Sequence, residues 1–115
     1  MPFCAGVEKC TLEGHSHYVS CCAFSPPDPA TGTSSMLVSG SYDNTLKIWD
    51  PASGVEKCTL GGHSGDVNCC AFLPDGKTVV SGSNDTTLKL WDPASGAPPL
   101  TLCILGSALT GALTH

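Results

Sequence analysis

Apolar residues along the chain fall in short runs, separated by polar and turn-forming residues. Two runs, 18–24 and 67–72, are almost continuously apolar, which favours strands covered on both faces. The segment Thr45-Leu46-Lys47-Ile48-Trp49 instead alternates polar and apolar side chains, as a more exposed strand does. Further short strands are predicted at 36–41, 55–60, 77–83 and 86–91. Helical spacing is absent over any useful length, so the sequence predicts an all-β fold.

Turn chemistry marks the joints between these runs. The pentapeptide Asp50-Pro51-Ala52-Ser53-Gly54 recurs unchanged at 92–96. Proline fixes φ and glycine accepts positive φ, so both copies are predicted to be turns. Pro74-Asp75-Gly76 predicts a tight turn between hairpin strands.

The whole pattern occurs twice along the sequence. Residues 7–12 (Val-Glu-Lys-Cys-Thr-Leu) reappear at 55–60, and Gly14-His15 reappears at 62–63. The stretch from Ser39-Gly40-Ser41 to Trp49-Asp50 returns at 81–92. The second offset is shorter than the first, because the first copy contains a proline-rich insertion around 26–35. A repeat in the forties is typical of four-stranded propeller blades.

The ordered elements Gly-His, strand, Ser-Gly-Ser and x-Asp-x-Thr-x-Lys-x-Trp-Asp resemble the WD40-repeat family of β-propellers. The resemblance covers residues 7 to about 102. It implies two four-stranded antiparallel blades in an incomplete ring, with an orphan N-terminal strand. The implied boundaries are an orphan outer strand of a missing preceding blade at 1–12, blade 1 at 13–60, blade 2 at 61–104 and an irregular tail at 105–115. Ile104-Leu105 stands where a third Gly-His is due.

Each repeat holds a His, a Ser, an Asp and a Trp at matching positions. They are His15, Ser39, Asp43 and Trp49 in the first repeat, and His63, Ser81, Asp85 and Trp91 in the second. The family resemblance implies two structural tetrads, in which Trp donates to Ser, Ser meets His, and His meets Asp. Ser, His and Asp also compose nucleophilic triads, so a hydrolase built on Ser81, His63 and Asp85 is the alternative. A catalytic serine needs an exposed Oγ and an oxyanion hole, so we expect no enzyme, cofactor or metal site.

The two repeats differ mainly at loops and turns that propeller topology places on one rim, the top face. Blade 1 has Tyr18, Ser20 and Tyr42 where blade 2 has Asp66, Asn68 and Asn84. Members of the resembled family dock peptides and subunits on this face, and tyrosines supply large contact area. These six residues are therefore candidates for binding a protein or peptide; drift at loosely constrained positions is the alternative. His17, opposite Gly65, is expected to be a solvated loop residue.

Charge and cysteine usage limit the partners and the location. The formal net charge is −5 with five Lys and Arg residues, which argues against nucleic acid and membrane as partners. Six of the eight cysteines are repeat-equivalent pairs: Cys10 and Cys58, Cys21 and Cys69, Cys22 and Cys70. We predict reduced, buried thiols and a cytoplasmic or nuclear location. The apolar tail at 100–113 is too short for a spanning helix, and the start lacks a signal peptide.

Two repeats are too few to close a propeller, which typically has about 4–8 blades. Two interpretations accommodate this: the chain is a fragment or non-functional truncated product of a longer propeller, or several copies assemble into a ring. Four copies would give eight blades. The orphan first strand and the missing third Gly-His favour the fragment.

Overall fold

All the regular secondary structure in the described part of the chain is β-strand, which confirms the predicted all-β class. The computed structural model describes residues 6–33, 35–94, 99–105 and 108–114, and from residue 102 onward the description covers the backbone alone. The strands are β1 (Val19–Phe24), β2 (Leu37–Ser41), β3 (Thr45–Asp50), β4 (Val55–Gly61), β5 (Val67–Phe72), β6 (Val79–Ser83), β7 (Thr87–Trp91), β8 (Leu100–Leu105) and β9 (Ala108–Thr114).

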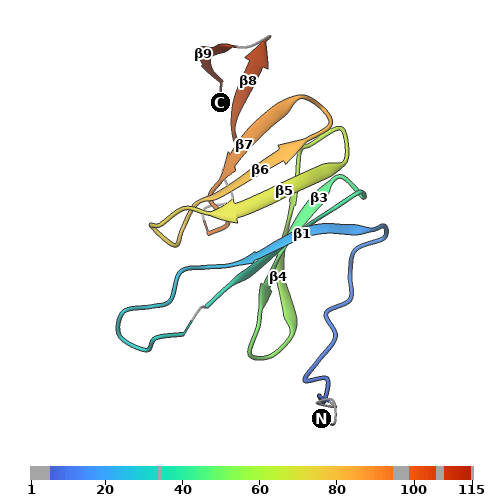
Figure 1. Ribbon diagram of the computed structural model, residues 1–115, viewed down its shortest axis with the longest axis vertical. Helices are drawn as coiled ribbons and strands as arrows, with labels where there is room; N and C mark the ends of the chain where they lie inside the picture. Colours follow the sequence, from blue (N-terminus) through green and yellow to red (C-terminus); the bar gives the residue numbers. More distant parts are fainter. Residues whose placement is uncertain (1–5, 34, 95–98, 106–107, 115) are drawn as a thin grey trace, which may run out of the picture.

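The strands form two antiparallel sheets, stacked beside each other in Figure 1. The first sheet has the order β1-β2-β3-β4, and the second has the order β5-β6-β7-β8-β9. We call β1–β4 blade 1 and β5–β8 blade 2. Their registers match: Val38 lies opposite Ile48 in blade 1, and Val80 lies opposite Leu90 in blade 2. The sequence repeat is therefore a structural repeat, residue by residue.

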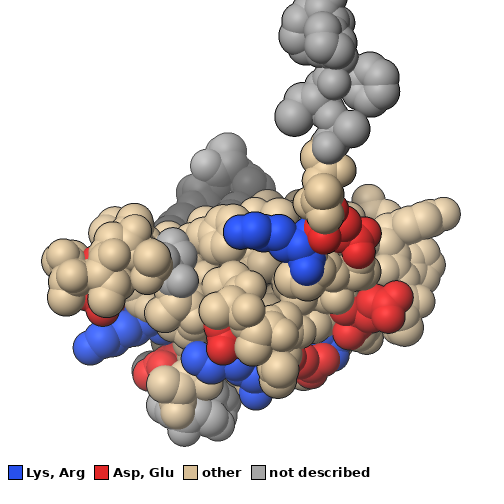
Figure 2. Space-filling model, turned by 90° about the horizontal axis from the view of Figure 1, so that it is seen from below, with Lys and Arg blue, Asp and Glu red and all other residues tan. Residues whose placement is uncertain are grey.

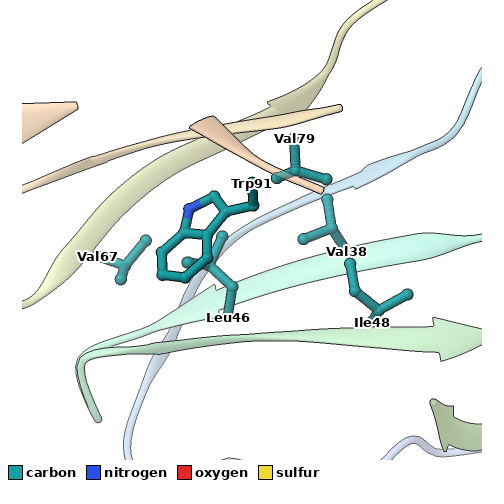
Figure 3. Packing of buried hydrophobic residues seen from close by; sticks show 6 residues of the cluster. All are labelled: Val38, Leu46, Ile48, Val67, Val79 and Trp91. Atoms are coloured by element: carbon teal, nitrogen blue, oxygen red, sulfur yellow. The ribbon is translucent and has the colours of Figure 1, made fainter. Parts of the chain in front are cut away.

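The apolar core lies between the two blades. Its buried residues are Val38, Leu46 and Ile48 from blade 1, and Val67, Val79 and Trp91 from blade 2 (Figure 3). β5 packs against both β1 and β2. Because side chains alternate between the two faces of a strand, each blade contributes only one of its faces to this core.

Gly40 lies at a close approach between the two blades. A Cβ atom at this position would lie 2.6 Å from Cys21 Sγ and 2.6 Å from Val67 Cγ1. Val67 is fully buried, so it has little freedom to yield. Gly40→Ala should therefore lower the free energy of unfolding by about 1–3 kcal/mol, the usual cost of overpacking a core.

Chemical denaturation followed by circular dichroism measures that loss, and Gly61→Ala is the matched control. A Cβ at Gly61 would meet no atom within 4 Å. The control variant should therefore be as stable as the wild type. Equal stability of the two variants would show that the blades do not meet at Gly40.

The turn before the third strand of each blade contains a residue with left-handed backbone. Asn44 has φ 73° and Thr86 has φ 72°. The backbone N–H of Asn44 donates to Ser41 O, and that of Thr86 donates to Ser83 O. Asparagine tolerates this conformation, whereas a β-branched residue is strained in it.

Thr86→Asn should therefore stabilise the protein by about 1 kcal/mol, because it relieves that strain and restores the residue present in blade 1. Asn44→Thr should destabilise it by a similar amount. Thermal unfolding should show a higher melting temperature for Thr86→Asn and a lower one for Asn44→Thr. A lower melting temperature for Thr86→Asn would contradict the strain.

The amino-terminal segment differs from the predicted orphan strand. Residues 6–12 pair with no strand, and residues 1–5 of the predicted segment lie outside the described residues. The identical hexapeptide at 55–60 forms β4 because it pairs with the free edge of β3. β4 occupies this edge of β3, so residues 7–12 have no equivalent partner among the described strands. The same six residues are therefore a strand in one place and irregular in the other.

The carboxy-terminal segment differs from the predicted irregular tail. β9 runs antiparallel to β8, with Thr101 opposite Thr114 and Leu102 opposite Leu113. An outer strand leaves one row of backbone N–H and C=O groups unpaired, and a hairpin satisfies them. The second sheet therefore has five strands rather than four. Residues 106–107, between the two strands, lie outside the described residues.

Burial of the first strand of each blade also differs from the prediction of cover on both faces. Val19 and Phe24 of β1 are 58% and 61% exposed, whereas Val67 of β5 is buried. β5 is covered by blade 1 on one face, and the corresponding face of β1 has no cover within the described part of the chain.

The cysteines are less buried than predicted. The described cysteines are free thiols, and each is exposed or only partly buried: Cys10, Cys21, Cys22, Cys58, Cys69 and Cys70.

Candidate functional site

The four polar residues of the first repeat meet in one chain of hydrogen bonds. Trp49 Nε1 donates to Ser39 Oγ at 2.8 Å, and Ser39 Oγ lies 2.7 Å from His15 Nε2. His15 Nδ1 lies 2.9 Å from Asp43 Oδ2. The indole can only donate and the Asp43 carboxylate can only accept, so a neutral His15 ring accepts at Nε2 from the Ser39 hydroxyl. His15 then carries its proton on Nδ1 and donates to Asp43.

The second repeat reproduces this geometry. Trp91 Nε1 to Ser81 Oγ is 2.8 Å, Ser81 Oγ to His63 Nε2 is 2.7 Å, and His63 Nδ1 to Asp85 Oδ2 is 2.8 Å. The structure thus brings together all eight residues of the predicted tetrads. Each tetrad ties the loop before the first strand of a blade to its second and third strands.

Both aspartates also organise the turn in which they sit. Asp43 accepts from Thr45 N and Thr45 Oγ1, and from Ser16 N in the loop. Burial alone would raise the pKa of Asp43, but the hydrogen bonds from Thr45, His15 and Ser16 outweigh it. They hold the pKa of this carboxyl well below its usual range, and Thr87, His63 and Ser64 do the same for the pKa of Asp85. Thr45 and Thr87 thus hold the tetrad aspartates in place. The repeated x-Asp-x-Thr spacing in the sequence could have indicated this role.

The bond distances of the second tetrad are also those of a Ser-His-Asp triad, so accessibility separates the two interpretations. Ser81 is 1% exposed and Ser39 is 7% exposed. Each serine oxygen also accepts from an indole N–H. A nucleophile must reach its substrate, and neither hydroxyl faces solvent. The arrangement is suited to holding strands together.

The rim residues of blade 1 form an exposed aromatic group. Tyr18 and Tyr42 are 72% and 40% exposed, and their ring centroids lie 6.0 Å apart. The His17 ring lies 4.9 Å from that of Tyr18 and 6.0 Å from that of Tyr42. A shallow, open depression is lined by His15, Ser16, His17 and Tyr18. His17 thus belongs to the group, which the sequence did not indicate because Gly65 stands in its place in blade 2.

The equivalent positions of blade 2 are polar. Asn68 Nδ2 donates to Asn84 Oδ1 at 2.8 Å, and Asn84 N donates to the carbonyl of Asp66. The same backbone bond joins Tyr42 N to Tyr18 O in blade 1. Ser20 differs from the other rim residues, because its hydroxyl donates to the carbonyls of Gly40 and Val67. It therefore links β1 of blade 1 to β5 of blade 2.

Charge is sparse and mixed on the surface. Figure 2 shows one face on which the few basic side chains lie beside acidic ones. Lys47 and Glu56, for example, form an ion pair of 3.1 Å. Within the described ranges no group of three or more His, Cys, Asp or Glu side chains is placed to hold a metal ion. The same residues contain no helix long and apolar enough to cross a membrane.

Two antiparallel blades, each pinned by a Trp-Ser-His-Asp tetrad, define a β-propeller repeat protein. Comparison with protein families gives the same result. The family described as "WD domain, G-beta repeat" (WD40) matches residues 6–50 and 54–92. The chain belongs to this family.

Several known proteins are similar to part of the chain. Nuclear distribution protein PAC1 of Fusarium vanettenii is 36% identical over 57 residues, covering 36% of this chain and 13% of the relative. Nuclear distribution protein nudF of Aspergillus flavus is 37% identical over 57 residues, covering 36% and 12%. Nuclear distribution protein PAC1-1 of Uncinocarpus reesii is 34% identical over 61 residues, covering 40% and 14%. The aligned region is thus a small part of each of these longer proteins.

Proposed function

We propose that this chain is a protein-interaction scaffold that binds peptide segments of partner proteins on its top face, without enzymatic activity. The binding surface consists of the aromatic group His17, Tyr18 and Tyr42 together with the polar group Asp66, Asn68 and Asn84. The observation that carries the proposal is the exposure of three aromatic rings in mutual contact. Membership of the WD40 family supports an interaction role in general.

The aromatic group has the properties of a peptide-binding anchor. Tyrosine and histidine rings offer a large contact area and lose little conformational entropy on binding. Tyr18 is 72% exposed and Tyr42 is 40% exposed, and neither belongs to the apolar core between the blades. A peptide side chain that covers them would remove apolar area from water at small entropic cost.

The polar group supplies complementary hydrogen-bonding atoms on the adjacent blade. The side chains of Asn68 and Asn84 are exposed and contact each other, and Asp66 is partly exposed. An amide pair and a carboxylate suit the backbone amides and the donor side chains of an extended peptide. With a net charge of −5, the chain favours neutral or basic segments over acidic ones.

We further propose a cytoplasmic or nuclear location. The described cysteines are free thiols, as is usual in reducing compartments. The relatives are named nuclear distribution proteins, which is consistent with an intracellular role.

A random peptide library displayed on phage and selected on the purified chain tests the proposal. The selected sequence is synthesised, and its dissociation constant is measured by isothermal titration calorimetry. Tyr18→Ala and Tyr42→Ala should each weaken binding at least about tenfold, or about 1.4 kcal/mol.

Val55→Ala is the matched control, because Val55 is 60% exposed and lies on β4, away from the aromatic group. Its affinity for the selected peptide should equal that of the wild type. Selected peptides whose affinity is insensitive to Tyr18 and Tyr42 would contradict the proposed surface.

A further inference from the structure

The contact between the two blades shows which faces of this repeat fit together. Blade 1 contributes Val38, Leu46 and Ile48, and strand β1 adds the partly buried Cys21 and Ala23. Blade 2 contributes Val67, Val79 and Trp91, together with Cys70 and Phe72. We call the core-facing surface of blade 1 its forward face and the core-facing surface of blade 2 its rear face. The forward face of one blade thus packs on the rear face of the next.

Blade 2 repeats the forward face on its far side. Its residues are the repeat counterparts of the blade 1 set, namely Cys69, Ala71, Val80, Leu88 and Leu90. Each is exposed or only partly buried, whereas Val38, Leu46 and Ile48 are buried. A Cβ at Gly82 would meet Cys69 and Leu88, as one at Gly40 meets Cys21 and Val67. Both of these atoms come from blade 2 itself, so among the described side chains none takes the place of Val67 at Gly82.

Blade 1 repeats the rear face on its far side. The counterparts of Val67, Cys70, Phe72 and Val79 are Val19, Cys22, Phe24 and Leu37. Val19 and Phe24 are more than half exposed, Cys22 is exposed and Leu37 is partly buried. We call this set the open rear face, and the blade 2 set the open forward face.

We propose that a second copy of this chain covers these faces, with the open rear face of one copy packed on the open forward face of the next. The internal contact between the blades is the template, since it joins the same two surfaces within one chain. Exposed apolar faces of this kind are unfavourable in water and are normally covered by a partner. The resulting interface is head to tail, because it joins two different surfaces.

A head-to-tail interface between identical chains closes into a ring when its rotation permits. Propellers have about 4–8 blades, so a ring of two-bladed chains contains two to four copies. In the repeated geometry residues 7–12 of one copy would lie where β8 of its neighbour lies, because their counterparts at 55–60 form β4. This segment pairs with no strand, so it can move aside without breaking sheet hydrogen bonds.

Size-exclusion chromatography with multi-angle light scattering on the purified 115-residue chain tests the proposal. The expected mass is two to four times 11.7 kDa, and it should approach the single-chain value on dilution. A folded chain that stays at 11.7 kDa over the whole concentration range would overturn the proposal.

Two variants test the geometry of the contact. Phe24→Lys places a charge on the open rear face, and Leu90→Lys places one on the open forward face. Each variant alone should have the mass of one chain. Each keeps one intact face of the opposite kind, so an equimolar mixture should form a two-chain complex that does not grow further.

Val55→Lys is the matched control. Val55 is 60% exposed and Phe24 is 61% exposed, and Val55 belongs to neither open face. It should assemble like the wild type. Assembly that both lysine variants preserve, or a mixture of the two that remains single chains, would overturn the head-to-tail contact. Circular dichroism of each variant verifies that the sheet is retained.

Discussion

Trp91→Ala should lower the free energy of unfolding by about 3–5 kcal/mol, a large part of the stability of a small domain. Two losses add up at this position. The indole is 4% exposed and belongs to the apolar core between the blades, so its removal leaves a cavity there. Its N–H also completes the second tetrad through Ser81. Equilibrium denaturation measures the total.

Trp91→Phe separates these two losses. Phenylalanine keeps most of the apolar ring and removes the N–H donor, so it should cost clearly less than alanine. A near-equal loss for both variants would assign the role of Trp91 to the hydrogen bond alone. No measurable loss for alanine would contradict the core described between the blades.

Ser81→Ala should lower the free energy of unfolding by about 2–4 kcal/mol. Its hydroxyl accepts from Trp91 Nε1 and bonds His63 Nε2, so alanine leaves two buried polar groups without a partner. Each such group costs about 1–3 kcal/mol. Ser64→Ala is the control: Ser64 is exposed and adjoins the same histidine, and this change should stay within about 0.5 kcal/mol.

The same variant distinguishes a structural tetrad from a catalytic triad. If Ser81 were a nucleophile, Ser81→Ala would abolish turnover of an ester such as p-nitrophenyl acetate and leave the stability nearly unchanged. We expect the reverse: a marked loss of stability, and the same background hydrolysis as the wild type.

The repeat made much of this architecture predictable from the sequence. Strand order, the β2–β3 turns and both tetrads follow from positions that recur in both copies. A hydrogen-bonded chain such as Trp91, Ser81, His63 and Asp85 requires specific residue types, so it leaves a distinct pattern in the sequence. The register then follows, because a shift of one residue would turn these side chains to the opposite face.

Features that depend on neighbours were not predictable from the local pattern. The hexapeptide at 55–60 is a strand because it pairs with β3, whereas its copy at 7–12 pairs with none of the described strands. β9 forms because β8 offers an edge, although no repeat signal extends so far. Phe24 and Phe72 occupy equivalent positions, yet only Phe72 has a neighbouring blade to pack on. His17 joins the two tyrosines through loop geometry that its sequence position does not reveal.

Hydrogen exchange of the indole N–H groups tests the central claim most directly, namely that a buried tetrad locks each blade. The chain has two tryptophans, so a ¹⁵N-labelled sample gives two indole signals, and both should exchange far more slowly than free tryptophan. Ser39→Ala should release the Trp49 signal first, and Ser81→Ala the Trp91 signal. Two indole groups that exchange as fast as free tryptophan in the folded protein would contradict the account.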